Sequence, residues 1–116
     1  MGYRAHIVTE CIRKHGGFEA FNWKANEVQE MLEKNGIDVR IQRIDVESAM
    51  WEISTAGDSG KMYQRFIAKL ETLPPDEINE FFLPDGGYTN EDVKDVLENW
   101  WGYRDKRDDV IRVDWF

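Results

Sequence analysis

Carboxylates are the side chains most able to do chemistry in this chain, and they are concentrated in its C-terminal part. Residues 74–116 hold twelve acidic side chains against five basic ones, so this stretch carries seven of the eight net negative charges. The acids are Asp76, Glu77, Glu80, Asp85, Glu91, Asp92, Asp95, Glu98, Asp105, Asp108, Asp109 and Asp114. A field of one sign steers a basic partner and repels nucleic acid and anionic membranes. We therefore predict a basic protein partner, no direct binding of nucleic acid and no membrane association.

Part of this acidic region has the spacing of a helix. Glu91, Asp95 and Glu98 are separated by four and three residues, so we expect them to share one exposed helix face. Aromatic residues follow at positions 101 and 103, and exposed aromatics surrounded by charge are typical of binding hot spots. The predicted partner-binding residues are Glu91, Asp95, Glu98, Trp101, Tyr103, Asp105, Asp108 and Asp109. The alternative for the tryptophans is that Trp100 and Trp101 pack under the last strand, against Trp115 and Phe116.

The enzyme motifs in the chain are incomplete. Residues 57–60 read Gly-Asp-Ser-Gly, as around the nucleophile of trypsin-like serine proteases, but those enzymes need a histidine and a buried aspartate on a double barrel about twice this long. Only His6 and His15 are available as bases. Gly60-Lys61 lacks the glycine spacing and the Ser or Thr of a phosphate-binding loop. Cys11 and His15 are expected at a strand end rather than on one helix face. We predict no catalytic residue, no metal ligand and no cofactor.

Length and composition favour one globular domain over residues 1–116. The chain is 41% hydrophobic and 33% charged and has fifteen aromatic residues, which is more than an acidic disordered tail would carry. A single cysteine excludes an internal disulfide. The N-terminus lacks the apolar run of a signal peptide, and no apolar stretch approaches the roughly 20 residues of a membrane span. We therefore expect a soluble, intracellular protein in the cytoplasm.

The elements that must position these carboxylates can be read from periodicity and turn residues. We expect strands over 3–12, 37–42, 50–54 and 110–115, with the first ended by a turn at Gly16-Gly17. We expect helices over 24–35, over 62–73 and from Thr89, and a helical turn over 76–80. Residues 56–60 are expected to form a connection. The order β-α-β-β-α-α-β predicts an α+β fold in which about four mostly antiparallel strands carry helices on one face.

The helix from Thr89 has the clearest signals. Thr89 followed by Asn90, Glu91 and Asp92 is a strong N-cap pattern. Its predicted core-facing residues are Val93, Val96, Leu97 and Trp100. The last strand ends the sequence, and a terminal strand usually persists only when it is paired, so we expect it inside the sheet beside the first strand.

Three stretches also resemble small acidic phage-encoded proteins that act on host proteins. They are the start Met1-Gly2-Tyr3-Arg4, the helix opening Gly87-Tyr88-Thr89-Asn90-Glu91-Asp92 and the end Val113-Asp114-Trp115-Phe116. The resemblance concerns size and composition, identifies no single family and transfers no functional residue. It implies a host-directed inhibitor as one form of the function.

These observations favour a non-enzymatic acidic protein-interaction module. In its sharpest form, the module inhibits a basic nucleic-acid-binding protein by imitating nucleic acid. Two alternatives stay open. One is a small carboxylate-dependent enzyme with at least two close acids in a concave pocket. The other is a self-associating structural domain that uses its terminal strand as a free edge, with a homodimer as the expected state.

Overall fold

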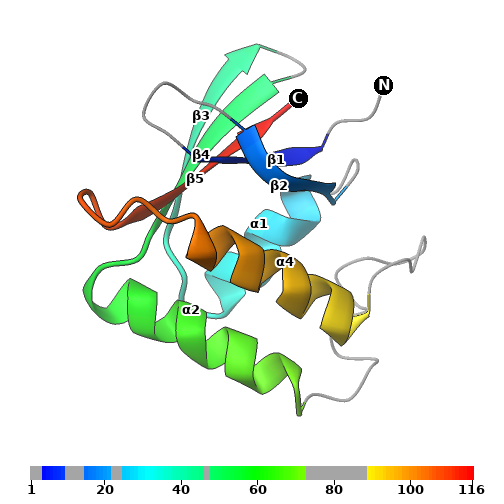
Figure 1. The fold of residues 1–116 in the computed structure, drawn as a ribbon, viewed down its shortest axis with the longest axis vertical. Coiled ribbons are helices and arrows are strands. Elements are labelled where there is room, and N and C mark those ends of the chain that lie inside the picture. The colour runs from blue at the N-terminus through cyan, green and yellow to red at the C-terminus, as the bar shows by residue number, and fades with distance from the viewer. Residues whose placement is uncertain (1–3, 10–14, 22–24, 46–47, 73–88) are drawn as a thin grey trace.

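Figure 1 shows the computed structural model of the chain, which describes residues 4–9, 15–21, 25–45, 48–72 and 89–116. In chain order its elements are β1 (Ala5–Val8), β2 (His15–Ala20), α1 (Ala25–Lys34), β3 (Val39–Asp45), β4 (Ser48–Ser54), α2 (Gly57–Leu70), α4 (Asn90–Gly102) and β5 (Val110–Trp115). The predicted α+β class and antiparallel sheet are confirmed. Cys11 and the predicted helical turn over 76–80 lie outside the described residues.

Strand β5 lies in the middle of the sheet. The strand order is β2-β1-β5-β4-β3, and every neighbouring pair is antiparallel. Trp115 of β5 stands opposite Ala5 of β1 and Ala49 of β4. The prediction that the last strand is paired beside the first is confirmed, whereas the alternative in which it forms a free edge is wrong. The outermost strands are β2 and β3.

Strand β2 corrects the prediction of a turn at Gly16-Gly17. Both glycines lie within β2, and Gly16 pairs with Ile7 of β1. Glycine weakens a strand but keeps its backbone N–H and C=O, so a neighbouring strand can still hold it in the ladder. The sheet therefore has five strands rather than about four.

One face of the sheet forms the core. Successive strand residues point to opposite faces, and alternate residues of β4 are buried accordingly. The sheet contributes Ala5, Ile7, Ala49, Trp51, Ile53, Ile111, Val113 and Trp115 to this core. The helices contribute Val28, Met31, Leu32, Tyr63, Phe66, Ile67, Leu70, Val93, Val96, Leu97 and Trp100. Figure 1 shows α1, α2 and α4 on the same side of the sheet, as predicted.

Helix α1 ends as the sequence predicts, at Asn35-Gly36. The N–H of Ile37 donates to the carbonyl of Leu32 at 3.1 Å, and the N–H of Gly36 donates to that of Glu33 at 3.1 Å. Gly36 has φ +79°, the left-handed conformation in which glycine has no steric penalty. The chain then turns directly into β3.

Helix α2 begins earlier than predicted, because residues 57–60 form its first turn rather than a flexible connection. The Ser59 hydroxyl donates to the carbonyl of Ser54 at 2.9 Å and accepts the N–H of Asp38 at 3.2 Å. Gly60 lies so close to the chain before the helix that a Cβ there would stand 2.1 Å from the carbonyl oxygen of Thr55. The Gly-Asp-Ser-Gly sequence therefore has a structural role at this helix start.

Candidate protein-interaction surface

Helix α4 presents its carboxylates on a well-anchored scaffold. Thr89 and Asp92 form a capping box: the Asp92 N–H donates to the Thr89 hydroxyl at 3.1 Å, and the Thr89 N–H donates to the Asp92 carboxylate at 3.1 Å. All four predicted core residues of the helix are buried. The buried Tyr63 hydroxyl also donates to the carbonyl of Leu97 at 2.7 Å, and burial raises the pKa of this tyrosine well above its usual value. The carboxylates are thus held by a fixed helix.

The opposite face of this helix is exposed and acidic. Glu91, Asp95 and Glu98 are all exposed, as the sequence predicts, and together they are called the acidic face of α4. Glu91 also lies in the first helical turn, where a negative charge complements the exposed N–H groups. Like charges at such spacings cost a few tenths of a kcal/mol. The helix therefore tolerates a small repulsion along this face.

Lys94 compensates only one side of the acidic face. Its Nζ lies 2.7 Å from Glu71 Oε1 at the end of α2 and 3.5 Å from Glu98 Oε1. The hydrogen bond that Lys94 donates to Glu71, supported by the charge of Glu98, raises the pKa of Lys94. Glu91 and Asp95 form no ion pair within the described residues. They are the two acids of the face that remain uncompensated.

Trp101 is half-buried rather than a freely exposed anchor. Its ring stacks on Tyr63 with centroids 5.3 Å apart, and the Arg104 guanidinium carbon lies 4.6 Å from its centroid. Arg104 also donates to the Trp101 carbonyl at 2.9 Å. The ring of Trp101 is therefore used for internal packing against Tyr63 of α2. Among the described residues of this helix end, Tyr103, with 43% of its surface exposed, is the aromatic side chain available for contact.

The alternative packing of the tryptophans also differs from the structure. Trp100 is buried, but its aromatic neighbour is Phe21, which it meets edge-on at 5.7 Å. Trp115 lies against Trp51 at 4.8 Å. Phe116 stacks on His6 at 3.9 Å, on the other side of the sheet from the core.

Two further predicted partner-binding acids, Asp105 and Asp108, are held by Arg112. Arg112 Nη1 lies 2.6 Å from Asp105 Oδ2, and Nη2 lies 2.8 Å from Asp108 Oδ2. The hydrogen bond from Arg112, together with the N–H groups of Asp108 and Arg107, lowers the pKa of Asp105. These contacts in turn raise the pKa of Arg112. The two carboxylates close the loop that leads into β5.

The loop itself is built around Asp109. This residue adopts φ +51°, and its carbonyl accepts the N–H of Thr55 at 2.8 Å. Asp105 and Val110 exchange backbone hydrogen bonds across the loop. The loop follows the C-terminal end of α4, whereas Glu91 lies at the N-terminal end, about 20 Å away for a helix of this length. The predicted acids therefore form two separate groups.

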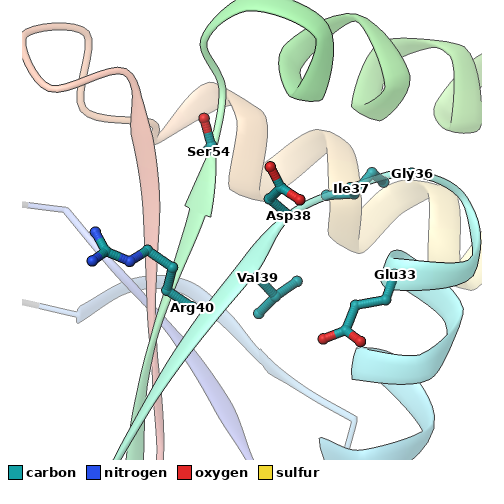
Figure 2. Close-up of a pocket in the computed structure, with 7 residues that line it drawn as sticks. All are labelled: Glu33, Gly36, Ile37, Asp38, Val39, Arg40 and Ser54. Atoms are coloured by element: carbon teal, nitrogen blue, oxygen red, sulfur yellow. The ribbon is translucent and has the colours of Figure 1, made fainter.

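A pocket elsewhere in the fold contains carboxylates that the sequence did not single out. It has a volume of about 500 Å³ and lies where α1 gives way to β3, lined by Glu33, Gly36, Ile37, Asp38, Val39, Arg40 and Ser54. Figure 2 shows Glu33 on the last turn of α1 and Asp38 just before β3, with Val39 between them in this view. The periodicity of the sequence does not indicate this pocket, because the residues that line it come from separate elements. This pocket is one place where a carboxylate-dependent enzyme could bind a substrate, and the enzyme alternative stays a prediction.

The face of the sheet opposite the core also brings distant polar residues together. His6 of β1 and Asp114 of β5 are direct cross-strand partners, and Asp114 is only 8% exposed. In the next rung of β4 and β5, Glu52 faces Arg112, with Oε2 3.6 Å from the guanidinium Nε. Residues 6 and 114 lie at opposite ends of the sequence, so sequence spacing could not reveal their contact.

In the part of the chain that the structure describes, no group of three or more His, Cys, Asp or Glu side chains could hold a metal ion. Over the same residues, no helix has both the length and the apolar character needed to cross a membrane. The whole chain matches no protein-family model, no curated protein and no solved structure.

Proposed function

We propose that this protein is a non-enzymatic interaction module that binds a basic protein through the acidic face of α4. The observation that carries the proposal is the pair Glu91 and Asp95, which are exposed on a capped, core-anchored helix and form no ion pair within the described residues. Carboxylates carried by a helix that is already folded require no ordering of the backbone when a partner binds. Tyr103 is an additional contact at the far end of the same helix.

The partner in this proposal is a basic surface that normally binds nucleic acid, and the module inhibits it by occupying that surface. Carboxylates on successive helical turns offer such a surface a row of anions, as phosphates do. Binding of this kind is steered by charge and weakens as salt rises, because the screening length falls to about 8 Å near physiological ionic strength.

The test compares two variants with equal changes in charge. In Glu91→Lys/Asp95→Lys the uncompensated acids of α4 are reversed, and in Glu27→Lys/Glu30→Lys two acids of α1 are reversed. Glu27, like Glu91, lies in the first turn of its helix, so the control also matches the interaction with the helix dipole. The immobilised wild type and both variants are used to capture basic proteins from a lysate, and elution is followed against salt.

We expect the α1 variant to retain the captured protein and the α4 variant to lose it. The purified captured protein is then bound to a labelled DNA duplex, and the wild type is expected to displace the duplex whereas the α4 variant is not. Equal capture by all three proteins would contradict the role of α4. Capture without displacement would leave a binding module but refute the inhibitor.

A further inference from the structure

Among the strands whose side chains the structure describes, β3 is the most exposed. It pairs with β4 on one side only, and no described strand lies beyond it. An unpaired edge offers a row of backbone N–H and C=O groups on which another extended chain can form hydrogen bonds. Natural edges are often protected by shortness, proline or a central bulge. β3 has seven residues and no proline, and its register shift is confined to the end between Arg43 and Asp45.

The side chains of this edge are exposed as well as its backbone. All five residues from Arg40 to Ile44 are exposed, and Ile41 and Ile44 are 37% and 57% exposed. Figure 1 shows β3 and β4 extending beyond the helices, which explains why Ile41 is uncovered although it points to the core side of the sheet. Ile41 and Ile44 therefore each add exposed apolar surface to this edge, Ile41 on the core side and Ile44 at the register shift.

The charge of this edge is opposite in sign to that of the molecule. Strand β3 contains Arg40, Arg43 and one acid, Asp45 at its last position, in a chain of net charge −8. Arg40 stands opposite Glu52 in the ladder, but the Glu52 carboxylate lies 3.6 Å from Arg112. A second copy of β3 would add its own net positive charge to the same edge, which is unfavourable. An acidic strand would complement it.

We propose that the open edge of β3 binds an extended segment of another protein in which acidic and apolar residues alternate. The segment adds to the sheet as an antiparallel strand, because antiparallel pairing is the more stable kind and the whole sheet already uses it. Its apolar side chains lie beside Val39 and Ile41 on the core side, and its acidic side chains lie beside Arg40 and Gln42 on the other side. This surface is separate from the acidic face of α4, so the protein has two interfaces of opposite charge.

The proposal is tested with a blocked, fluorescein-labelled peptide of alternating Val and Glu, using the full chain and fluorescence anisotropy. A peptide of alternating Val and Lys is the matched probe, and Arg40→Glu is the test variant. Arg65→Glu makes the same change of charge on the exposed face of α2, away from the sheet edge. Urea unfolding of both variants establishes that they are folded.

We expect the wild type to bind the Glu peptide more tightly than the Lys peptide. Arg40→Glu should weaken binding of the Glu peptide about fivefold, which corresponds to the upper end of the range for one cross-strand charge pair. The same variant should bind the Lys peptide more tightly than the wild type does. Arg65→Glu should bind both peptides like the wild type. In hydrogen exchange, the Glu peptide should protect amides of β3.

Several results would overturn the proposal. They are failure of the Glu peptide to bind at its highest soluble concentration, equal binding of both peptides, and new protection outside β3. A fourth result is a dimer that forms with rising concentration in light scattering and whose β3 amides are protected from hydrogen exchange without peptide. This result would assign the edge to a second copy of this chain. These outcomes are independent of α4, because none of the variants changes the acidic face.

Discussion

Arg112 determines how the acids that follow α4 are used. It contacts Asp105 and Asp108 across the loop and Glu52 across the sheet, at 2.6, 2.8 and 3.6 Å. A carboxylate held in this way is partly neutralised, so it contributes less to a recognition surface than Glu91 or Asp95. The same residue type thus stabilises a loop at one end of α4 and faces solvent at the other.

The contact between Asp105 and Arg112 predicts a pH-dependent contribution to stability. The folded protein holds the pKa of Asp105 below its ordinary value, so this stabilisation is present above the ordinary pKa and is lost as pH falls through the lowered one. Asp105→Asn should therefore lower the melting temperature at neutral pH, and the gap to wild type should narrow on acidification. Thermal unfolding from about pH 7 to about pH 3 measures this. Glu30→Gln, which removes an exposed unpaired acid, is the control, and a gap that stays constant would contradict the prediction.

Helix α4 is the element whose local signals and tertiary contacts agree most fully. Its capping box fixes its start, its four core-facing residues are buried, and its other face remains free for acids. Helix α2 shows the opposite situation. Its first turn contains two glycines, which are poor helix formers, yet the turn forms because Ser59 and Gly60 pack against the chain at 54–55.

The start of α2 gives a prediction with an internal control. In Gly60→Ala the new methyl group would meet the Thr55 carbonyl, whereas in Gly102→Ala nothing lies within 4 Å of the new atom. We expect Gly60→Ala to lower the free energy of unfolding by about 1–3 kcal/mol or more, as for overpacking of a tight site. Gly102→Ala should be neutral or slightly stabilising, because alanine favours the helix. Urea unfolding of the two variants measures the difference, and similar midpoints would refute the close approach at Gly60.

Among the described residues, the predominant sign of the exposed charges differs between elements. The exposed positions of α4 include Glu91, Asp92, Asp95 and Glu98, whereas those of α2 include Lys61, Arg65 and Lys69. The edge strand β3 also exposes two basic residues, Arg40 and Arg43. A chain that is strongly acidic overall therefore has distinct acidic and basic surfaces, which is the basis for proposing two different kinds of partner.

The strand order predicts a gradient of hydrogen exchange across the sheet. Amides of β5 should exchange only with global unfolding, because β5 is paired on both sides and carries the fully buried Val113 and Trp115. The outward-facing amides of β3 should exchange fastest among the strands with described side chains, because that edge is unpaired. Exchange measured by NMR at neutral pH checks this. Equal protection of β5 and the outer amides of β3 would contradict the strand order or reveal an occupied edge.

Most helices and strands could be predicted from the sequence where local signals are strong. Thr89 and Asp92 mark the start of α4, Asn35-Gly36 marks the end of α1, and the alternation of Ile111, Val113 and Trp115 marks β5. The acidic face of α4 could be predicted for the same reason, since residues on one helix face are set by spacing alone. Strand β2 could not, because Gly16-Gly17 has the local preference of a turn and only pairing with β1 holds it extended.

By itself, the sequence determined which residues share one face of a helix or strand, including the acids of α4, because this depends on the fixed periods of helices and strands. Only the tertiary structure decided which charged side chains are used in contacts within the protein and which are left to contact a partner. Arg112 reaches Asp105 and Asp108 through a loop closure, Lys94 reaches Glu71 across two helices, and β3 becomes an edge because β5 takes the centre of the sheet. Such contacts join residues from different elements, and their distance in space is set by packing rather than by position along the chain.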